Sequence, residues 1–484
     1  MTRDENRDIL TDTAEPLEEQ AAAGPTGAAE TEDIFVSEEE VQRIMAQYDK
    51  ESNTRFFSGA REKIVHGLCI AFTLYVIAFN TVLLMPQQMR RASFVGFIII
   101  FAIMLYPACE RDKKANFIPW YDWIIALAGG ASFFYYVANY KEIVAQVGVY
   151  TVPNMVVAVI GILVLFECCR RVVGVPLMIV VAVFLCYAYF GKYLGGDFGH
   201  AGYTLKRLIT FMFYTTEGVI GTPISVCASF IFIFILFGAF LEKTGIGQFF
   251  IDIANAVAGK AVGGPAKVAV IASALEGTVS GSSVANTVGS GSFTIPMMKK
   301  LGYKPEFAAA VEATASTGGQ IMPPIMGAAA FLMAEITQIP YSRIILAAAI
   351  PATLYFTTVL LQVHFEAKKL RLKGLPEDEI PKAGKLLKEK GHLFLAIVAI
   401  VVFLSIGYTP GRSALMACAV AIVVSCFRKD TRITVKEFFN ALANGTRNSV
   451  GVAVACAMAG MIVGVVTLTG LGMTFASALQ SLSG

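Results

Sequence analysis

ASALEGTVSGSSVANTVGSGSFTIP (Ala272–Pro296) is the stretch of sequence that decides the fold. Its ends are apolar enough to enter a membrane, while its centre consists of Gly, Ser, Thr and Asn. Glycine weakens a continuous helix, and hydroxyl side chains compete for its backbone hydrogen bonds. Irregular backbone is tolerated at membrane depth only where it is buried in protein or lines a cavity. The stretch therefore predicts a re-entrant hairpin, in which two half-helices meet at a polar tip.

A second unusual stretch follows, EATASTGGQIMPPIMGAAA (Glu312–Ala330). Its paired prolines remove two N–H donors, so we expect regular helical bonding to fail between Thr317 and Pro324, opposite the hairpin tip. Half-helix ends at the midplane expose N–H groups, which bind carboxylates, and carbonyls, which coordinate cations such as sodium. Small residues in membrane helices also serve close packing. Two adjacent segments that combine polar side chains with breaks favour a binding site.

Composition defines the class of protein. Of the 484 residues, 56% are hydrophobic and 15% charged, against about 45–50% and about 25% in soluble chains. Apolar runs such as residues 92–108 do not alternate as the strands of a membrane β-barrel would. The sequence predicts an all-α integral membrane protein, a multi-pass helix bundle of the inner (plasma) membrane. It contains no Walker A, HExxH or GxSxG motif, so we expect neither an enzyme nor a bound cofactor.

Charge is distributed unevenly along the chain. Residues 1–50 hold fourteen acidic and four basic residues, which is typical of a disordered, solvated cytoplasmic tail and not of a nucleic-acid-binding arm. Basic residues beside the apolar blocks favour a cytoplasmic N-terminus. That orientation puts Arg90 and Arg91 on the extracytoplasmic side, together with Lys141 and Lys192.

Three carboxylates lie in or beside the unusual segments: Glu276, Glu312 and Glu335. An ionisable residue at membrane depth is a functional hypothesis by default. The alternatives are an interfacial position or an ion pair with a nearby lysine or with Arg343. We keep Glu276 and Glu312 as possible proton-coupling residues and expect Glu335 at the interface.

Two motifs carry a family resemblance: GGPAKVAVIASALEGTVSGSSVANTVGSGSFTIPMMKKLGY (Gly263–Tyr303) and VEATASTGGQIMPPIMGAAAFLMAEITQIPY (Val311–Tyr341). They resemble the fused membrane permease subunit of TRAP transporters, in the branch served by TAXI-type substrate-binding proteins. The resemblance covers most of the chain from about residue 60 onward. It implies a tail over 1–55, small-subunit-like membrane helices over 56–200, and a large-subunit-like transport domain over 201–484.

The resemblance further implies an elevator-type carrier built from inverted repeats, each with a hairpin and a broken helix. Such a carrier uses a sodium or proton gradient to take up a small organic anion delivered by an extracytoplasmic solute-binding protein. Matching the motifs residue by residue implies a substrate and ion site formed by the hairpin and the broken helix: Ser280, Ser282, Ser283, Asn286, Thr287, Thr317, Gly318, Gly319 and Pro323.

One departure from the family pattern concerns the second repeat. The chain ends at Gly484, where a second hairpin would be starting near residues 464–472. We therefore expect a C-terminally truncated chain with an incomplete inverted repeat. The alternative function is a membrane subunit or scaffold that does not transport.

The coupling ion is open between two mechanisms. Hydroxyl and amide oxygens of Ser282, Asn286 and Thr317 favour sodium, since a dehydrated cation needs such ligands without a full carboxylate. Glu312 offers the rival mechanism, in which a carboxylate takes up a proton.

Overall fold

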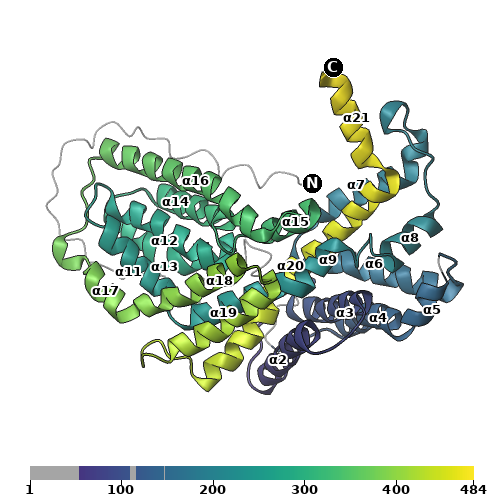
Figure 1. Cartoon of the computed structure of the whole chain (residues 1–484), viewed down its shortest axis with the longest axis horizontal. Helices are drawn as coiled ribbons and strands as arrows, with labels where there is room; N and C mark the ends of the chain where they lie inside the picture. Colours follow the sequence, from purple (N-terminus) through teal and green to yellow (C-terminus); the bar gives the residue numbers. More distant parts are fainter. Residues whose placement is uncertain (1–53, 110–115, 147, 484) are drawn as a thin grey trace, which may run out of the picture. The chain divides into compact units, whose positions relative to one another are not determined.

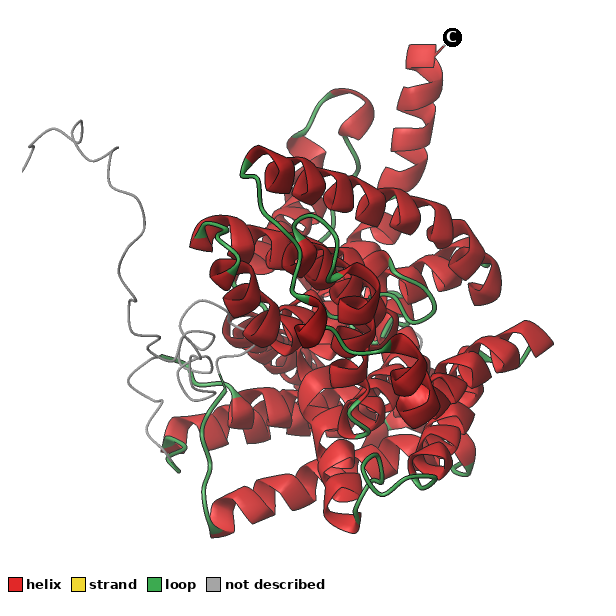
Figure 2. Ribbon diagram, turned by 90° about the vertical axis from the view of Figure 1, so that its left-hand side faces the viewer, coloured by secondary structure: helices red, strands yellow, loops and turns green. Residues whose placement is uncertain are grey.

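The computed structural model describes residues 54–109, 116–146 and 148–483. Within these ranges the chain is helical and contains no strand (Figure 2). Eight helical segments are long and apolar enough to cross a membrane. The prediction of an all-α, multi-pass membrane protein is therefore confirmed. The expected tail over 1–55 lies almost wholly outside the described residues.

Several of the N-terminal helices pack on one another. Helix α3 packs against α4, and α4 against α6. In chain order these elements are α2 (Ala60–Thr81), α3 (Gln87–Leu105), α4 (Trp120–Ala138), α5 (Tyr140–Ala145), α6 (Val152–Val172), α7 (Val175–Phe190), the 3₁₀ turns η2 (Gly191–Tyr193) and η3 (Gly196–Phe198), and α8 (Leu205–Tyr214).

The second half begins with one span that contains a π-helical turn, η4 (Cys227–Ile231), between α9 (Thr222–Val226) and α10 (Phe232–Lys243). It continues with α11 (Ile246–Ala258), α12 (Gly264–Ser280), α13 (Ser283–Lys300), α14 (Pro305–Gly318), the 3₁₀ turn η5 (Gly319–Ile321), α15 (Ala328–Thr337) and α16 (Tyr341–Lys369). The remaining elements are η6 (Glu377–Glu379), α17 (Ala383–Lys390), η7 (Gly391–Leu393), α18 (Phe394–Ile406), α19 (Pro410–Ser425), α20 (Val435–Thr469) and α21 (Leu471–Ser483).

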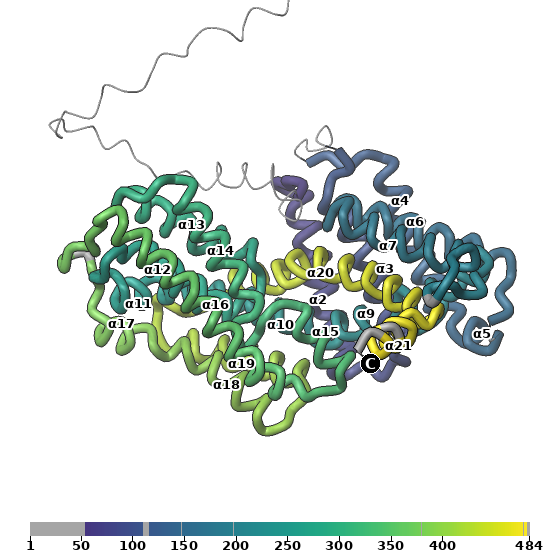
Figure 3. The backbone as a smooth tube through the Cα atoms, turned by 90° about the horizontal axis from the view of Figure 1, so that it is seen from above, coloured from purple at the N-terminus to yellow at the C-terminus, as the bar shows by residue number. Residues whose placement is uncertain are grey.

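Helix α20 joins the two halves. Its 35 residues extend about 50 Å at 1.5 Å per residue, and it packs against α10 as well as α2, α3, α6 and α7 (Figure 1). A capping box formed by Thr434 and Glu437 begins it. Buried hydroxyls tie it to α2, since Thr73 Oγ1 donates to the Leu442 carbonyl at 2.8 Å and lies 2.8 Å from Thr446 Oγ1. Helices α11 to α14 and α16 form a separate group, visible in both Figure 1 and Figure 3.

Two arginines lie in the last turn of α6, which continues through Arg170 and Arg171 to Val172. Both form ion pairs, Arg170 with Glu167 at 2.7 Å. Arg171 binds Asp122 of α4 at 2.8 Å and Glu167 at 2.7 Å, and Asp122 also pairs with Arg55. The side chains of Arg55, Asp122 and Arg171 are all buried, so this cluster is an internal clamp between the start of α4 and the end of α6.

This clamp gives a stability prediction. Asp122→Asn removes the negative charge between two buried guanidinium groups, and we expect a loss of about 3–5 kcal/mol of stability, as for other broken buried ion pairs. The measurement is the thermal unfolding midpoint in detergent, with Glu242→Gln as control because Glu242 is an exposed partner of Lys243. An unfolding midpoint of Asp122→Asn equal to that of the control would contradict the clamp.

Candidate functional site

The hairpin expected at Ala272–Pro296 is present. Helix α12 ends at Ser280, α13 begins at Ser283, and the two helices pack against each other. Gly281 has a positive φ of 60°, the left-handed conformation that glycine adopts without strain, and this stops α12. Ser282 then caps α13, its hydroxyl accepting the Ala285 N–H at 3.3 Å. The chain thus reverses direction over two residues.

The expected broken helix is also present. Helix α14 ends at Gly318, a 3₁₀ turn follows over Gly319–Ile321, and regular helix returns only at Ala328. The unwound segment contains both prolines, which cannot donate to a helical ladder. Its backbone groups find other partners. The Gly327 N–H donates to the Gln320 carbonyl at 2.7 Å, and the hydroxyl of Tyr341 donates to the Pro324 carbonyl at 3.0 Å.

Hairpin and broken helix meet directly. A side chain on Gly277 would collide with the backbone of Gly319, and one on Gly281 would collide with the Met326 carbonyl. Gln320 Nε2 also donates to Ser283 Oγ at 3.0 Å across the junction. The prediction that the break faces the hairpin tip is confirmed, because the two backbones touch.

The side chains expected at the site fall into two groups. Asn286 is buried: its Nδ2 donates to the Ser273 carbonyl at 2.9 Å, and its Oδ1 lies 3.4 Å from Ser280 Oγ. Thr287 and Thr317 instead donate to carbonyls of their own helices at 2.9 and 2.7 Å, and the Thr317 side chain is exposed. Pro323 lies in the unwound loop, and Gly318 faces Tyr355 and Phe356 of α16. The structure brings together the remaining expected residues at the junction: Ser280, Ser282, Ser283, Asn286 and Gly319. Their roles as ligands remain predictions.

Glu312 of α14 is fully buried. Its Oε1 accepts hydrogen bonds from Ser273 at 3.0 Å, Ser290 at 2.5 Å and Ser316 at 3.2 Å. Its Oε2 accepts one from Thr294 at 2.5 Å. The hydroxyls come from α12, α13 and α14, so a single carboxylate fastens both hairpin arms to the helix that breaks. No described residue forms an ion pair with it.

These four hydroxyl residues were not singled out from the sequence. A signal for part of the set was available, since Asn286, Ser290 and Thr294 are spaced by four and share one face of α13. Ser316 has the same spacing from Glu312 on α14. Repeated polar residues at this spacing within an apolar block indicate a polar helix face that needs a partner.

The other two carboxylates differ from Glu312. Glu276 is half-buried, close to α11 and α13: a side chain on Gly247 or Gly289 would come within 3.3 Å of one of its oxygens. Glu335 is half-buried on α15 and lines a different cavity. Among the described residues no cluster of three His, Cys, Asp or Glu could hold a metal ion.

Comparison with known proteins shows the family of this chain. The family described as Tripartite ATP-independent periplasmic transporter, DctM component, matches residues 160–484. The C4-dicarboxylate TRAP transporter large permease protein DctM of Pseudomonas aeruginosa is 28% identical over 203 residues, covering 42% of this chain and 47% of that protein. The sialic acid TRAP transporter large permease protein SiaM of Vibrio cholerae is 27% identical over 210 residues, covering 43% and 48%.

A third relative, the isethionate TRAP transporter permease protein DctMQ of Oleidesulfovibrio alaskensis, is 23% identical over 252 residues, covering 52% of this chain and 39% of that protein. The chain thus spans less than half the length of each of these three relatives. Fold and site together define a multi-pass helical protein of the inner membrane. The chain belongs to the TRAP transporter family, as a DctM-type large permease domain, and this is a family of transporter permeases rather than enzymes.

The contact between the two backbones gives a second prediction. A methyl group on Gly319 would lie 2.8 Å from Asn286 Nδ2 and 2.9 Å from the Gly277 Cα. Because backbone cannot yield as a side chain can, we expect Gly319→Ala to destabilise the protein by about 1–3 kcal/mol. The matched control is Gly384→Ala in α17, where a methyl group meets nothing within 4 Å. Thermal unfolding of both variants measures the difference, and equal midpoints would show that the two backbones do not touch.

Proposed function

We propose that this protein is the permease of a secondary transporter that uses an ion gradient to take up a small organic anion. The observation that carries the proposal is the direct contact between the hairpin tip and the broken helix. Discontinuous helices that meet inside a membrane protein are the usual construction of a coupled binding site. Regular spans would suffice for a purely structural subunit.

The helix ends at this contact suit both an anion and a cation. Helices α13 and α15 begin at the junction, so their N-terminal N–H groups and positive dipole ends favour a carboxylate or sulfonate. Helices α12 and α14 end there, and their last carbonyls favour a cation. The charge of the solute and that of the coupling ion thereby stabilise each other.

For the coupling ion we favour sodium. The tip offers backbone carbonyls, the Asn286 amide oxygen and the Ser282 hydroxyl, all of which are hard oxygen donors. The Thr317 hydroxyl of α14 is a further expected ligand, although in this structure it is exposed and donates to its own helix. The rival is a proton carried by Glu312, whose carboxylate is buried among hydroxyls. Glu276 is the second candidate carboxylate for carrying the coupled proton.

The proposals for the solute and for the partner protein rest on the family membership. We propose that an extracytoplasmic solute-binding protein of the TAXI type delivers the anion, as the Gly263–Tyr303 motif suggests. The relatives are named for C4-dicarboxylate, isethionate and sialic acid, which share an acidic group. We also keep residues 56–200 as small-subunit-like and 201–484 as the transport domain, although the family match begins earlier, at residue 160.

Two substitutions separate the coupling mechanisms. In proteoliposomes containing the intact permease and supplied with its binding protein, sodium coupling predicts that uptake vanishes without a sodium gradient and survives Glu312→Gln. Asn286→Ala should then raise the sodium concentration for half-maximal uptake by about tenfold, since it removes one oxygen ligand worth about 1.5 kcal/mol. Proton coupling predicts uptake that follows the pH gradient and fails in Glu312→Gln.

Matched controls lie on the same helices. Ser292→Ala alters an exposed hydroxyl of α13, and Glu306→Gln an exposed carboxylate of α14. Both should transport as the unmodified protein does. Uptake that needs no sodium ends the preference for sodium, and the absence of any uptake by well-folded protein refutes the proposed function.

A further inference from the structure

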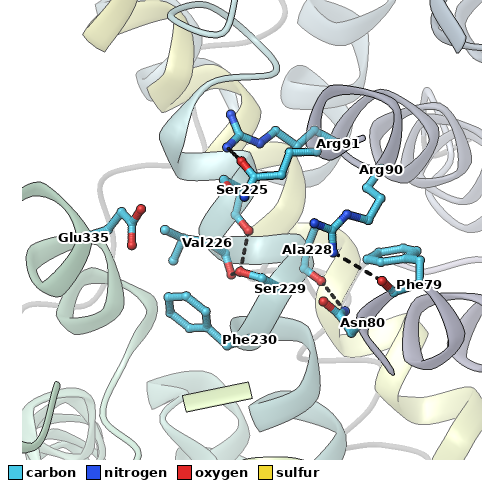
Figure 4. Close-up of a pocket in the computed structure, with 11 residues that line it drawn as sticks. Phe79, Asn80, Arg90, Arg91, Ser225, Val226, Ala228, Ser229, Phe230 and Glu335 are labelled. Carbon is cyan, nitrogen blue, oxygen red and sulfur yellow. Dashed lines mark hydrogen bonds between the residues drawn. The ribbon is translucent and has the colours of Figure 1, made fainter. Parts of the chain in front are cut away.

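A polar cavity lies away from the hairpin tip. It has a volume of about 180 Å³ and is lined from α2, α3, the α9–η4 segment and α15 (Figure 4). It shares Glu335 of α15 with the broken helix, and none of the residues at the hairpin junction lines it. Its polar side chains include Asn80, Gln87, Arg90, Arg91, Ser229 and Glu335.

Two arginines that are neighbours in the chain, Arg90 and Arg91, line this cavity. Arg90 Nη1 donates to the Phe79 carbonyl at 3.2 Å. Arg91 Nη1 donates to the Ile220 carbonyl at 3.2 Å, and its Nη2 donates to Gln87 Oε1 at 3.0 Å. All these acceptors are neutral. They hold the guanidinium groups in place without compensating their charge.

In the described part of the chain no carboxylate contacts these two arginines directly, although Glu335 and Glu217 are close enough to interact electrostatically with Arg91. Within the described ranges, neither arginine forms an ion pair. Arg91 Nε is buried and has no hydrogen-bond partner among the described residues. A buried donor without an acceptor raises the free energy of the protein. A ligand that accepts a hydrogen bond from Arg91 Nε therefore gains binding free energy.

Among the residues that the structure describes, Glu335 is the one carboxylate that lines the cavity, and it approaches from α15, on the other side from α3 (Figure 4). It is more than 4 Å from both guanidinium groups, since no ion pair links them. With Glu335 ionised, the lining therefore carries a net charge of +1.

We propose that this cavity binds an anion, and that Arg90 and Arg91 hold one phosphate, sulfonate or carboxylate group. Guanidinium groups bind such oxyanions through charge-assisted and often bidentate hydrogen bonds. At about 180 Å³ the cavity is smaller than typical pockets of about 300–1,000 Å³, so it takes a small acid or the head of a larger molecule.

The same chemistry has two sources at a membrane surface. One is a free anion, and the other is the phosphate of an anionic lipid. The expected orientation puts Arg90 and Arg91 on the extracytoplasmic side, where either source is available. The proposal concerns binding alone, so its outcome is independent of whether the hairpin transports.

The test uses the full chain purified in detergent, with sodium sulfate and phosphatidylglycerol as probes. Calorimetry measures sulfate affinity, and native mass spectrometry measures retained lipid. We expect saturable sulfate binding that Arg91→Gln weakens by about tenfold or more, because one charge-assisted pair is lost. Arg343→Gln is the matched control, since Arg343 is an exposed arginine at the start of α16 and lies outside the cavity.

Glu335→Gln gives a result of opposite sign. It removes the one negative charge from the lining, so sulfate should bind more tightly, by about threefold or more. If Arg91→Gln does not yield folded protein, the same binding measurements are made on Arg90→Gln and Glu335→Gln. A lipid ligand is supported by three results together. The unmodified chain retains phosphatidylglycerol, the retained lipid blocks sulfate binding, and the arginine variants lose the lipid. The proposal is overturned if neither sulfate nor phosphatidylglycerol shows binding that depends on Arg90, Arg91 and Glu335.

Discussion

The rest of the structure depends on one constraint: inside a membrane, every backbone N–H and C=O group must find a partner within the protein. The segment between Ile321 and Ala328 cannot satisfy it by helix formation, because Pro323 and Pro324 have no N–H to donate. Its groups are covered by Tyr341, by an internal turn and by the hairpin tip. The glycines at the contact follow from this arrangement, since a Cβ on Gly277, Gly281 or Gly319 would collide with backbone atoms of the facing segment.

The same constraint explains the polar interior of the hairpin. Glu312 is buried without an ion pair to any described residue, and four hydroxyl groups on three helices replace the water that it would otherwise bind. Each hydroxyl lies within hydrogen-bonding distance of the carboxylate, and those of Ser290 and Thr294 also reach backbone carbonyls of α13. A change in the charge of Glu312 would therefore be felt at both hairpin arms together. This links the chemistry of one side chain to the geometry of the whole site, whichever ion is coupled.

The features that sequence analysis predicted are those with local causes. Gly281 and Ser282 end one helix and begin the next, and two prolines stop a third, whatever surrounds them. Long apolar blocks predicted the spans for the same reason. The continuation of α6 through Arg171 could not be predicted, because it depends on Asp122, 49 residues away in the chain. The hydroxyl cage of Glu312 likewise joins residues up to 39 positions apart.

Charge compensation distinguishes the two pairs of arginines in this bundle. Arg55 and Arg171 share Asp122, and Arg171 also binds Glu167, so their charges are neutralised within the fold. Arg90 and Arg91 are held only by carbonyl and amide oxygens, which orient a guanidinium group but leave its charge exposed to the cavity. A structural role needs the first arrangement, since an uncompensated charge destabilises a bundle. The second arrangement is stable when the missing negative charge is brought by a ligand.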